Sequence, residues 1–292
     1  MATAISAAQV KQLRDQTGAG MMECKNALTE ANGDFEEANT ILRKRGLASA
    51  AKKAGRTANE GLIANAVAAD HATGILAEVN CESDFVARTP DFVQLMDRVL
   101  AEIEKAGDAA SDAWLKDPQG PVIKHVAPVI AKLGENMGVS RFVRYAGTGH
   151  VGQYIHLGGK IAVMVEFAGV TSAFSGRDEF TALVKEISMQ IAAASPQYAT
   201  RDEVPADLVE KEKAIYRAQM EHSGKPANVL EKIIDGKLGS FYKQVVLPDQ
   251  DSIRDTTGKT SVKDVLAAAN KSLGGTVSVT RFARLKVGET AA

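Results

Sequence analysis

The sequence predicts an α+β protein in which a small N-terminal three-helix domain precedes two related α+β subdomains. Two observations lead to this class. Capped helical patterns fill the first 46 residues, and the remainder contains an internal repeat of strand and helix patterns. The 292 residues are enough for two or three domains, and 45% apolar with 24% charged residues is ordinary for a folded protein.

Helix-capping signals define the first domain, residues 1–46. Ser6 and Gln9 form a capping box, and Asp34 is placed to cap a third helix that Gly46 is expected to end. Three short helices enclose a very small core, which suits docking better than catalysis. The expected helices span about residues 7–16, 21–31 and 35–46.

Residues 47–59 are rich in alanine and lysine or arginine. This composition favours a solvated helical linker over a nucleic-acid patch.

The internal repeat appears when the sequence is shifted against itself. A shift of 88 residues aligns a strand, a turn and an amphipathic helix, and a shift of 140 aligns a later helix and strand. The aligned pairs include Glu78 with Glu166, Phe92 with Phe180, Leu95 with Leu183, Val99 with Ile187, Ile103 with Ile191, and 139–144 with 279–284. We therefore expect subdomains at 60–146 and 147–287, followed by a tail at 288–292.

The change of shift from 88 to 140 places an insertion of about 52 residues in the second copy. Two helical patterns, 205–222 and 229–246, lie on either side of a break at 223–226, so a polar antiparallel helical hairpin is expected at about 200–246. Its apolar seam could serve only the hairpin or also a partner.

The turn that follows the apolar strand 75–79 carries an acid beside a large ring, Asp84 and Phe85. Either the ring folds into the core and the acid caps a helix, or the ring points outward at a partner. The second copy has Ser172 and Ala173 at these positions, with Phe174 one residue later. The scaffold therefore repeats and the pair does not, which leaves both interpretations open.

Composition excludes several classes of protein. A net charge of −1 and 5% aromatic residues argue against a nucleic-acid binder, and no apolar run approaches the length of a membrane span. Cys24 and Cys81 are far apart, which suits a reducing compartment and argues against structural zinc. Because the N-terminus has no signal-peptide pattern, we expect a cytoplasmic protein.

A search for catalytic motifs yields none. The segment 255–260 resembles the end of a phosphate-binding loop, but Ile253 stands where that motif needs glycine, so 255–260 and 158–160 are interpreted as turns. The five histidines lack metal-ligand spacing, although His156 precedes a glycine turn and could be functional. Glu78 and Glu166 recur by duplication, which favours a structural role. We expect no enzyme activity, catalytic residue, cofactor or metal.

Residues 13–28 contain Leu-Arg-x-x-Thr-Gly-x-Gly with a later Lys and Ala-Leu, and residues 83–86 are Ser-Asp-Phe-Val. These two stretches resemble signatures of the bacterial translation elongation factor Ts family, which usually has Thr at the position of Ser83. The resemblance implies an N-terminal domain of the ubiquitin-associated type, two related core subdomains, and a coiled-coil hairpin used in partner contacts or in a homodimer.

The resemblance also implies a function, acceleration of GDP release from elongation factor Tu. Residues Ser83, Asp84, Phe85 and Val86 would enter the G domain beside its Mg²⁺ site, while the second subdomain grips another domain of the partner. The implied docking residues are Leu13, Arg14, Thr17, Gly18, Met21, Lys25 and His156. No membrane or direct nucleic-acid contact is implied. A passive scaffold or chaperone-like binder is the alternative. Some members have an additional C-terminal helix that also touches the G domain, and because the stretch after Val287 is short here, we do not expect that contact.

Overall fold

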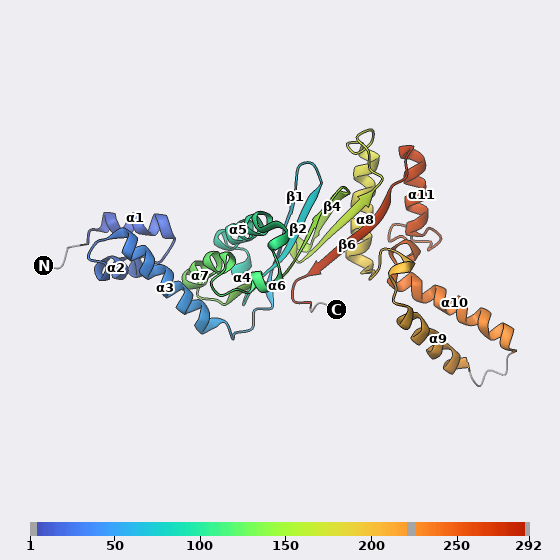
Figure 1. The fold of residues 1–292 in the computed structure, drawn as a ribbon, viewed down its shortest axis with the longest axis horizontal. Helices are drawn as coiled ribbons and strands as arrows, with labels where there is room; N and C mark the ends of the chain where they lie inside the picture. Colours follow the sequence, from blue (N-terminus) through green and yellow to red (C-terminus); the bar gives the residue numbers. More distant parts are fainter. Residues whose placement is uncertain (1–4, 221–225, 290–292) are drawn as a thin grey trace.

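The computed structural model describes residues 5–220 and 226–289 and mixes helices with two β-sheets, which confirms the α+β class. The first three helices are α1 (Ala7–Thr17), α2 (Met21–Glu30) and α3 (Phe35–Lys53) (Figure 1). Ser6 and Gln9 form the expected capping box, and the Asp34 side chain accepts a hydrogen bond from the Glu37 N–H. The small core between these helices contains Val10, Leu13, Cys24, Ala27, Leu28, Ala31, Ala38 and Ile41.

The prediction that Gly46 ends the third helix is wrong, because α3 continues to Lys53. Gly46 is buried against α7 (Pro121–Leu133), and a Cβ at this position would lie 3.5 Å from the Ala127 carbonyl oxygen. Glycine costs about 1 kcal/mol inside a helix relative to alanine. Here it lets two helix backbones approach closely. The expected linker is therefore largely helical, and Ala50 belongs to the core of the next subdomain.

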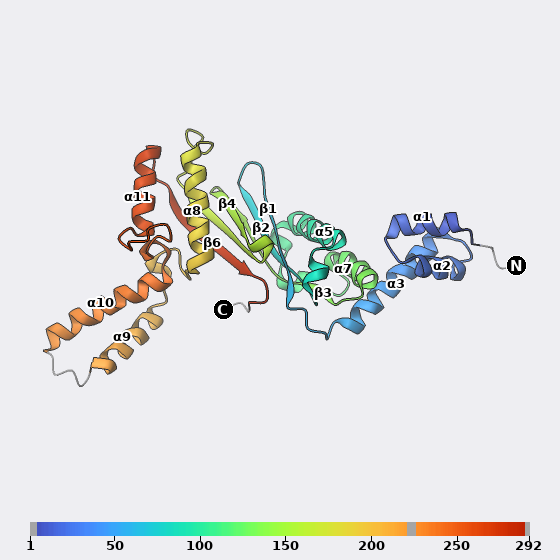
Figure 2. The same ribbon diagram turned by 180° about the vertical axis from the view of Figure 1, so that it is seen from behind.

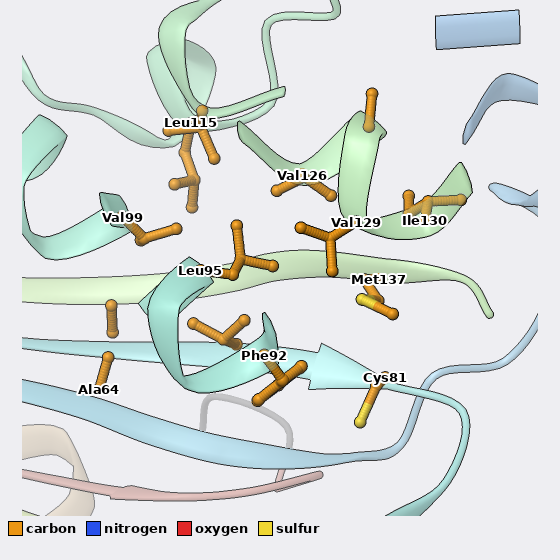
Figure 3. Packing of buried hydrophobic residues seen from close by; sticks show 14 of the residues in the cluster. Ala64, Cys81, Phe92, Leu95, Val99, Leu115, Val126, Val129, Ile130 and Met137 are labelled. Carbon is orange, nitrogen blue, oxygen red and sulfur yellow. The ribbon is translucent and has the colours of Figure 1, made fainter. Parts of the chain in front are cut away.

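Subdomain one contains an antiparallel sheet of order β1-β2-β3, made of β1 (Glu60–Val67), β2 (Thr73–Cys81) and β3 (Met137–Ala146). Between β2 and β3 the chain forms α4 (Asp84–Ala87), α5 (Pro90–Ala106), η1 (Gly107–Ala109), α6 (Asp112–Leu115) and α7. Figure 3 shows the core between these helices and the sheet, to which α5 contributes Phe92, Leu95 and Val99 and α7 contributes Val126, Val129 and Ile130.

Subdomain two has the same antiparallel order, β4-β5-β6, made of β4 (His150–His156), β5 (Ile161–Ala168) and β6 (Ser278–Lys286). Its sheet packs against α8 (Asp178–Ala194) and α11 (Val262–Leu273), and η2 (Leu157–Gly159) joins the first two strands. The register shifts just after Glu78 in the first sheet and just after Glu166 in the second. The repeated residues therefore occupy equivalent places, down to an irregularity in the strand pairing.

The two sheets pack against each other through a shared apolar layer. Alternate residues of β2, Ile75, Ala77 and Val79, face the helices of subdomain one, whereas Leu76 faces the other sheet. Figures 1 and 2 show α5 and α7 on one side of the paired sheets and α8 and α11 on the other. Both faces of the central strands are buried, which explains their nearly continuous apolar sequences. The shared layer contains Ile63, Leu76, Tyr145, Val151, Ala162, Met164 and Leu285.

An acid–arginine pair occurs at the same place in each sheet. Glu78 Oε2 accepts a hydrogen bond from Arg141 Nε at 2.8 Å, and Glu166 Oε2 accepts one from Arg281 Nε at 2.9 Å. The hydrogen bonds from Arg281 lower the pKa of Glu166. These contacts support the structural role predicted for the two acids.

Each pair also reaches the other subdomain. Arg141 Nη2 donates to the Lys286 carbonyl oxygen at 2.9 Å, and the Gly288 N–H donates to Glu78 Oε1 at 2.8 Å. In the opposite direction, the Arg281 guanidinium lies 4.1 Å from the centre of the Tyr145 ring. The duplicated pairs therefore join the subdomains reciprocally.

The insertion forms α9 (Ala206–Met220) and α10 (Ala227–Val245), which lie side by side and project from subdomain two (Figures 1 and 2). Short turns η3 (Arg201–Glu203) and η4 (Leu247–Asp249) flank it. Its apolar core lies near the base and contains Val204, Leu238, Phe241, Val245 and Val246, whereas no residue of α9 is buried. The start of the expected break, 223–225, lies outside the described residues.

In the part of the chain that the structure describes, none of the helices has both the length and the apolar character that crossing a membrane requires.

A histidine pair marks a further contact between the subdomains. His71 belongs to the β1–β2 turn, and its ring stacks on His150 of β4 with centroids 4.1 Å apart. His71 Nδ1 lies 2.9 Å from the Val151 carbonyl oxygen, and the His150 ring meets Phe180 edge to face. Burial, followed by the neighbouring His71, lowers the pKa of His150 to about 4 from an ordinary 6.5.

The Glu78→Ala variant is expected to lose about 3–5 kcal/mol of unfolding free energy, because it leaves Arg141 without the carboxylate beside it. Urea unfolding at neutral pH measures this loss. Glu104→Ala, which removes an exposed acid, should stay within about 0.5 kcal/mol of wild type. Equal effects of the two substitutions would contradict a structural role for Glu78.

Lower pH should destabilise the fold through His150. The folded protein keeps this ring neutral down to a pKa of about 4, whereas the unfolded chain takes up the proton near pH 6.5. The resulting stability is present above pH 6.5 and declines as the pH falls toward 4. His150→Phe keeps a ring but removes the titration, so its urea-unfolding free energy should change less than that of wild type between pH 7.5 and pH 5.

Candidate functional site

A one-turn helix, α4, follows the end of β2 and carries the acid–ring pair. Ser83 is its N-cap, with extended backbone angles, and the Ser83 hydroxyl accepts a hydrogen bond from the Val86 N–H. Thr89 then caps α5, and Pro90 occupies the first position of that helix. The interpretation of Asp84 as a helix cap is therefore wrong, because Ser83 is the cap and Asp84 is the first helical residue.

The Phe85 ring points outward. The residue is 80% exposed, although its neighbour Ala87 is 1% exposed and Val86 packs against the core of subdomain one. In the second copy Phe174 is only 4% exposed. Of the two interpretations left open by the sequence, the exposure supports an outward-facing ring, because a core phenylalanine would be buried.

Asp84 lies beside the ring and is paired within its own segment. Its carboxylate accepts a hydrogen bond from Arg88 Nη2 at 2.9 Å, and both side chains are open to solvent. Such an exposed pair contributes little to stability. Its effect here is to compensate part of the Asp84 charge.

Glu135 contacts the same turn, and sequence reasoning missed it. Its carboxylate accepts hydrogen bonds from the backbone N–H groups of Glu82 and Ser83, at 3.1 and 3.0 Å, and from the Ser83 hydroxyl at 2.6 Å. The repeat in the sequence did contain a signal that distinguishes Glu135. The 140-residue shift aligns Glu135 with Gly275, so this acid, like Asp84 and Phe85, is absent from the second copy.

The predicted docking residues of the first domain divide between its core and its surface. Leu13 is fully buried, so its side chain supports the domain and does not belong to the exposed surface. The Thr17 hydroxyl donates to the Leu13 carbonyl oxygen, and Gly18 has φ 69°, which favours glycine. The exposed members are Arg14, Met21 and Lys25, and the neighbouring Met22, not predicted, is 64% exposed.

The turn at Gly18 in the first domain lies near Lys132 of α7, which in turn bonds the start of α5. A Cβ at Gly18 would be 4.0 Å from Lys132 Nζ, and this ammonium donates to Asp91 Oδ1, at the start of α5, at 2.6 Å. Lys132 of α7 therefore lies between the first signature stretch and the start of α5, the helix that follows α4.

His156 is exposed at the end of β4, where the Tyr154 hydroxyl lies 3.0 Å from its Nδ1. The next residue, Leu157, is 66% exposed and has φ 49°, an unusual conformation for a non-glycine residue. Both η2 and α4 contact β1. The first residue of β1, Glu60, accepts a hydrogen bond from Lys160, which follows η2. Glu60 also pairs with Cys81, the last residue of β2 before the α4 turn. His156 and Phe85 therefore flank the same end of the paired sheets.

The two glycine-containing segments are turns, as predicted. The Asp255 carboxylate accepts hydrogen bonds from the Thr257 hydroxyl and from the N–H groups of Thr257, Lys259 and Thr260. The bonds from Thr257, that of its hydroxyl first, and those from Thr260 lower the pKa of Asp255. Gly158 and Gly159 both have positive φ within η2. Among residues 5–220 and 226–289, no three His, Cys, Asp or Glu side chains gather as a metal site.

Comparison with known proteins decides the family. Residues 82–289 match the family model described as Elongation factor TS. The chain belongs to the elongation factor Ts family. It is 42% identical to Elongation factor Ts of Trichlorobacter lovleyi over 98% of this chain and 93% of that relative. It is 44% identical to Elongation factor Ts of a Nitratiruptor species, over 98% of this chain and 94% of that relative. The sequence resemblance is thereby confirmed.

Phe85 and Phe174 lie one position apart in the repeat alignment and differ in exposure, which makes a stability prediction. Phe85→Ala should change the unfolding free energy by no more than about 0.5 kcal/mol, because the ring is exposed. Phe174→Ala should cost about 3–5 kcal/mol, because it empties a packed site. Urea unfolding of the two variants tests the pair. A large loss of unfolding free energy in Phe85→Ala would instead indicate that the Phe85 ring is packed in the core.

Proposed function

We propose that this member of the elongation factor Ts family binds the GDP form of elongation factor Tu and accelerates GDP release by disturbing the partner's Mg²⁺ site. Membership of the family supports a role in translation elongation. The single observation that carries the finer proposal is the Phe85 ring, 80% exposed on a turn whose neighbouring residues are anchored. An exposed large apolar side chain held in one place suits insertion into a partner.

Insertion of the ring acts on the nucleotide indirectly. In a G domain the metal ion bridges phosphate oxygens and protein ligands, so metal and GDP hold each other. Phe85, wedged between partner helices, displaces the groups that support the metal. The diphosphate charge is then less compensated, and GDP leaves faster.

Asp84 either repels the phosphates or hydrogen-bonds a helix end of the partner. Its contact with Arg88 compensates part of its charge in the free protein, which favours the hydrogen-bonding role.

One ring is not sufficient for a large acceleration. Each tenfold gain in the release rate requires that the activation free energy fall by about 1.4 kcal/mol. Burying one large apolar side chain supplies about 1.5–3 kcal/mol. Additional binding energy must come from the first domain, through Arg14, Met21 and Lys25, and from His156 of subdomain two on a second partner domain.

Thermodynamic linkage requires that the effect be reciprocal. If the protein weakens GDP binding, GDP weakens binding of the protein by the same factor. Fresh nucleotide therefore releases the factor, and the cycle needs no covalent chemistry.

A passive scaffold is the second candidate function. The hairpin favours it, because Ile215 and Val229 are exposed apolar residues on α9 and α10 and offer a surface for a partner or for a homodimer. A scaffold binds elongation factor Tu without changing the rate of nucleotide release.

The test measures release of fluorescent GDP from elongation factor Tu in excess unlabelled GDP, with and without the protein. Wild type should accelerate release, and Phe85→Ala should lose about ten- to hundredfold of this acceleration. This range follows because the burial energy of one ring, about 1.5–3 kcal/mol, corresponds to about one to two factors of ten in rate.

Ile253→Ala is the matched control, because it removes an exposed apolar side chain outside every segment proposed to contact the partner and should leave release unchanged. Binding without acceleration by the wild type would support the scaffold. Equal GDP-release rates with wild type and with Phe85→Ala would show that insertion of the Phe85 ring does not cause the acceleration.

A further inference from the structure

We infer that Glu135 is the positioning residue that keeps the Phe85 ring directed outward, an inference that rests on the proposed exchange function for its functional consequence. Glu135 does not touch the partner site itself. It acts through the backbone of the turn that carries the ring.

Both carboxylate oxygens of Glu135 bind this turn. Oε2 accepts from the N–H groups of Glu82 and Ser83, and Oε1 accepts from the Ser83 hydroxyl. Charge-assisted bonds of this kind are stronger and more directional than neutral ones. Gly134, with φ 81°, ends α7 and sets the direction in which Glu135 leaves the helix.

The turn holds the Glu135 segment in return. Glu82 Oε1 accepts a hydrogen bond from the Asn136 N–H at 2.6 Å, and Asn136 Nδ2 donates to the Arg56 carbonyl oxygen at 2.7 Å. The reciprocal contacts fix Glu82 and Ser83 at both the backbone and the side chain. A helix of four residues has little stability of its own, so α4 depends on such anchors.

The second copy shows the arrangement without this acid. Gly275 stands at the position of Glu135, and the ring of Phe174 packs directly over it. A Cβ added to Gly275 would lie 2.7 Å from Phe174 Cε1. Phe174 aligns with Val86, one position after Phe85, so the second copy shows that the space over this position admits an aromatic ring when the residue there is glycine. In the first copy the bound carboxylate of Glu135 occupies this place, and the Phe85 ring lies outside it.

A fluorescent reporter tests the positioning without any partner. Phe85→Trp is introduced into the Trp114→Phe background, which removes the chain's one tryptophan. With Glu135 present, the introduced indole should emit as a solvent-exposed group and be quenched readily by acrylamide. Glu135→Ala should shift the emission to shorter wavelength and reduce quenching at least twofold, as the ring folds inward. Unchanged emission and quenching would overturn the inference.

A double-mutant cycle tests the functional consequence in the GDP-release assay. Glu135→Ala should reduce the acceleration at saturating protein about tenfold or more, while the half-saturating concentration changes less than threefold. In the Phe85→Ala background the same substitution should have no further effect. Glu135→Gln, which retains one carbonyl oxygen, should recover part of the activity, and Glu104→Ala should behave as wild type.

The outcomes separate the two proposals. If wild type does not accelerate release, the proposed function fails and the indole experiment still decides the positioning. If wild type is active and the losses of Glu135→Ala and Phe85→Ala multiply, Glu135 acts elsewhere and the positioning fails. Thermal unfolding of Glu135→Ala and Glu135→Gln shows that both are folded before either comparison is made.

Discussion

The packing of one three-stranded sheet against the other is the constraint on which the rest of the structure depends. Because helices cover the outer face of each sheet, the central strands β2 and β5 are buried on both sides. Burial on both sides leaves the acids Glu78 and Glu166 away from water, and a buried charge is stable only when it is paired. The arginines of β3 and β6 supply that pairing and extend it across to the other subdomain. The sheet layer therefore orients the two subdomains as well as stabilising them.

A duplicated scaffold gives a natural control for its own functional site. Residues shared by the two copies, such as Phe92 with Phe180, lie in the core, where packing restricts change. The turn after the second strand carries no such restriction. One copy uses it to bury Phe174 over Gly275, whereas the other places Phe85 in solvent and Glu135 beneath the turn. The difference between inward and outward rings thus follows from a few residues, on a backbone frame that the two copies share.

Much of the secondary structure could be predicted from the sequence, because its signals are local. The capping box at Ser6, Pro90 at the start of α5 and the alternation of apolar residues each depend on near neighbours in the chain. The errors concern contacts between distant segments. Gly46 looked like a helix end because its closeness to α7 cannot be seen in its neighbours, and Leu13 looked like a docking residue because a motif does not distinguish core from surface. Glu135 was missed for the same reason, since the turn that it binds lies some 50 residues earlier.

The continuity of α3 bears on how binding energy is used. This helix contributes Ala38 and Ile41 to the first domain and Ala50 to the core of subdomain one. The same helix packs against α7, whose Lys132 bonds Asp91 at the start of α5, and the Arg56 carbonyl oxygen at the end of the linker accepts a hydrogen bond from Asn136. Two recognition elements joined by a flexible tether must each be ordered on binding, whereas elements held in fixed relation lose their freedom of motion together. In the proposed exchange mechanism, energy gained when the first domain docks is therefore available to drive insertion of the Phe85 ring. The long helix α3, for which the sequence suggested a short helix followed by a linker, connects the proposed docking domain to the core of subdomain one.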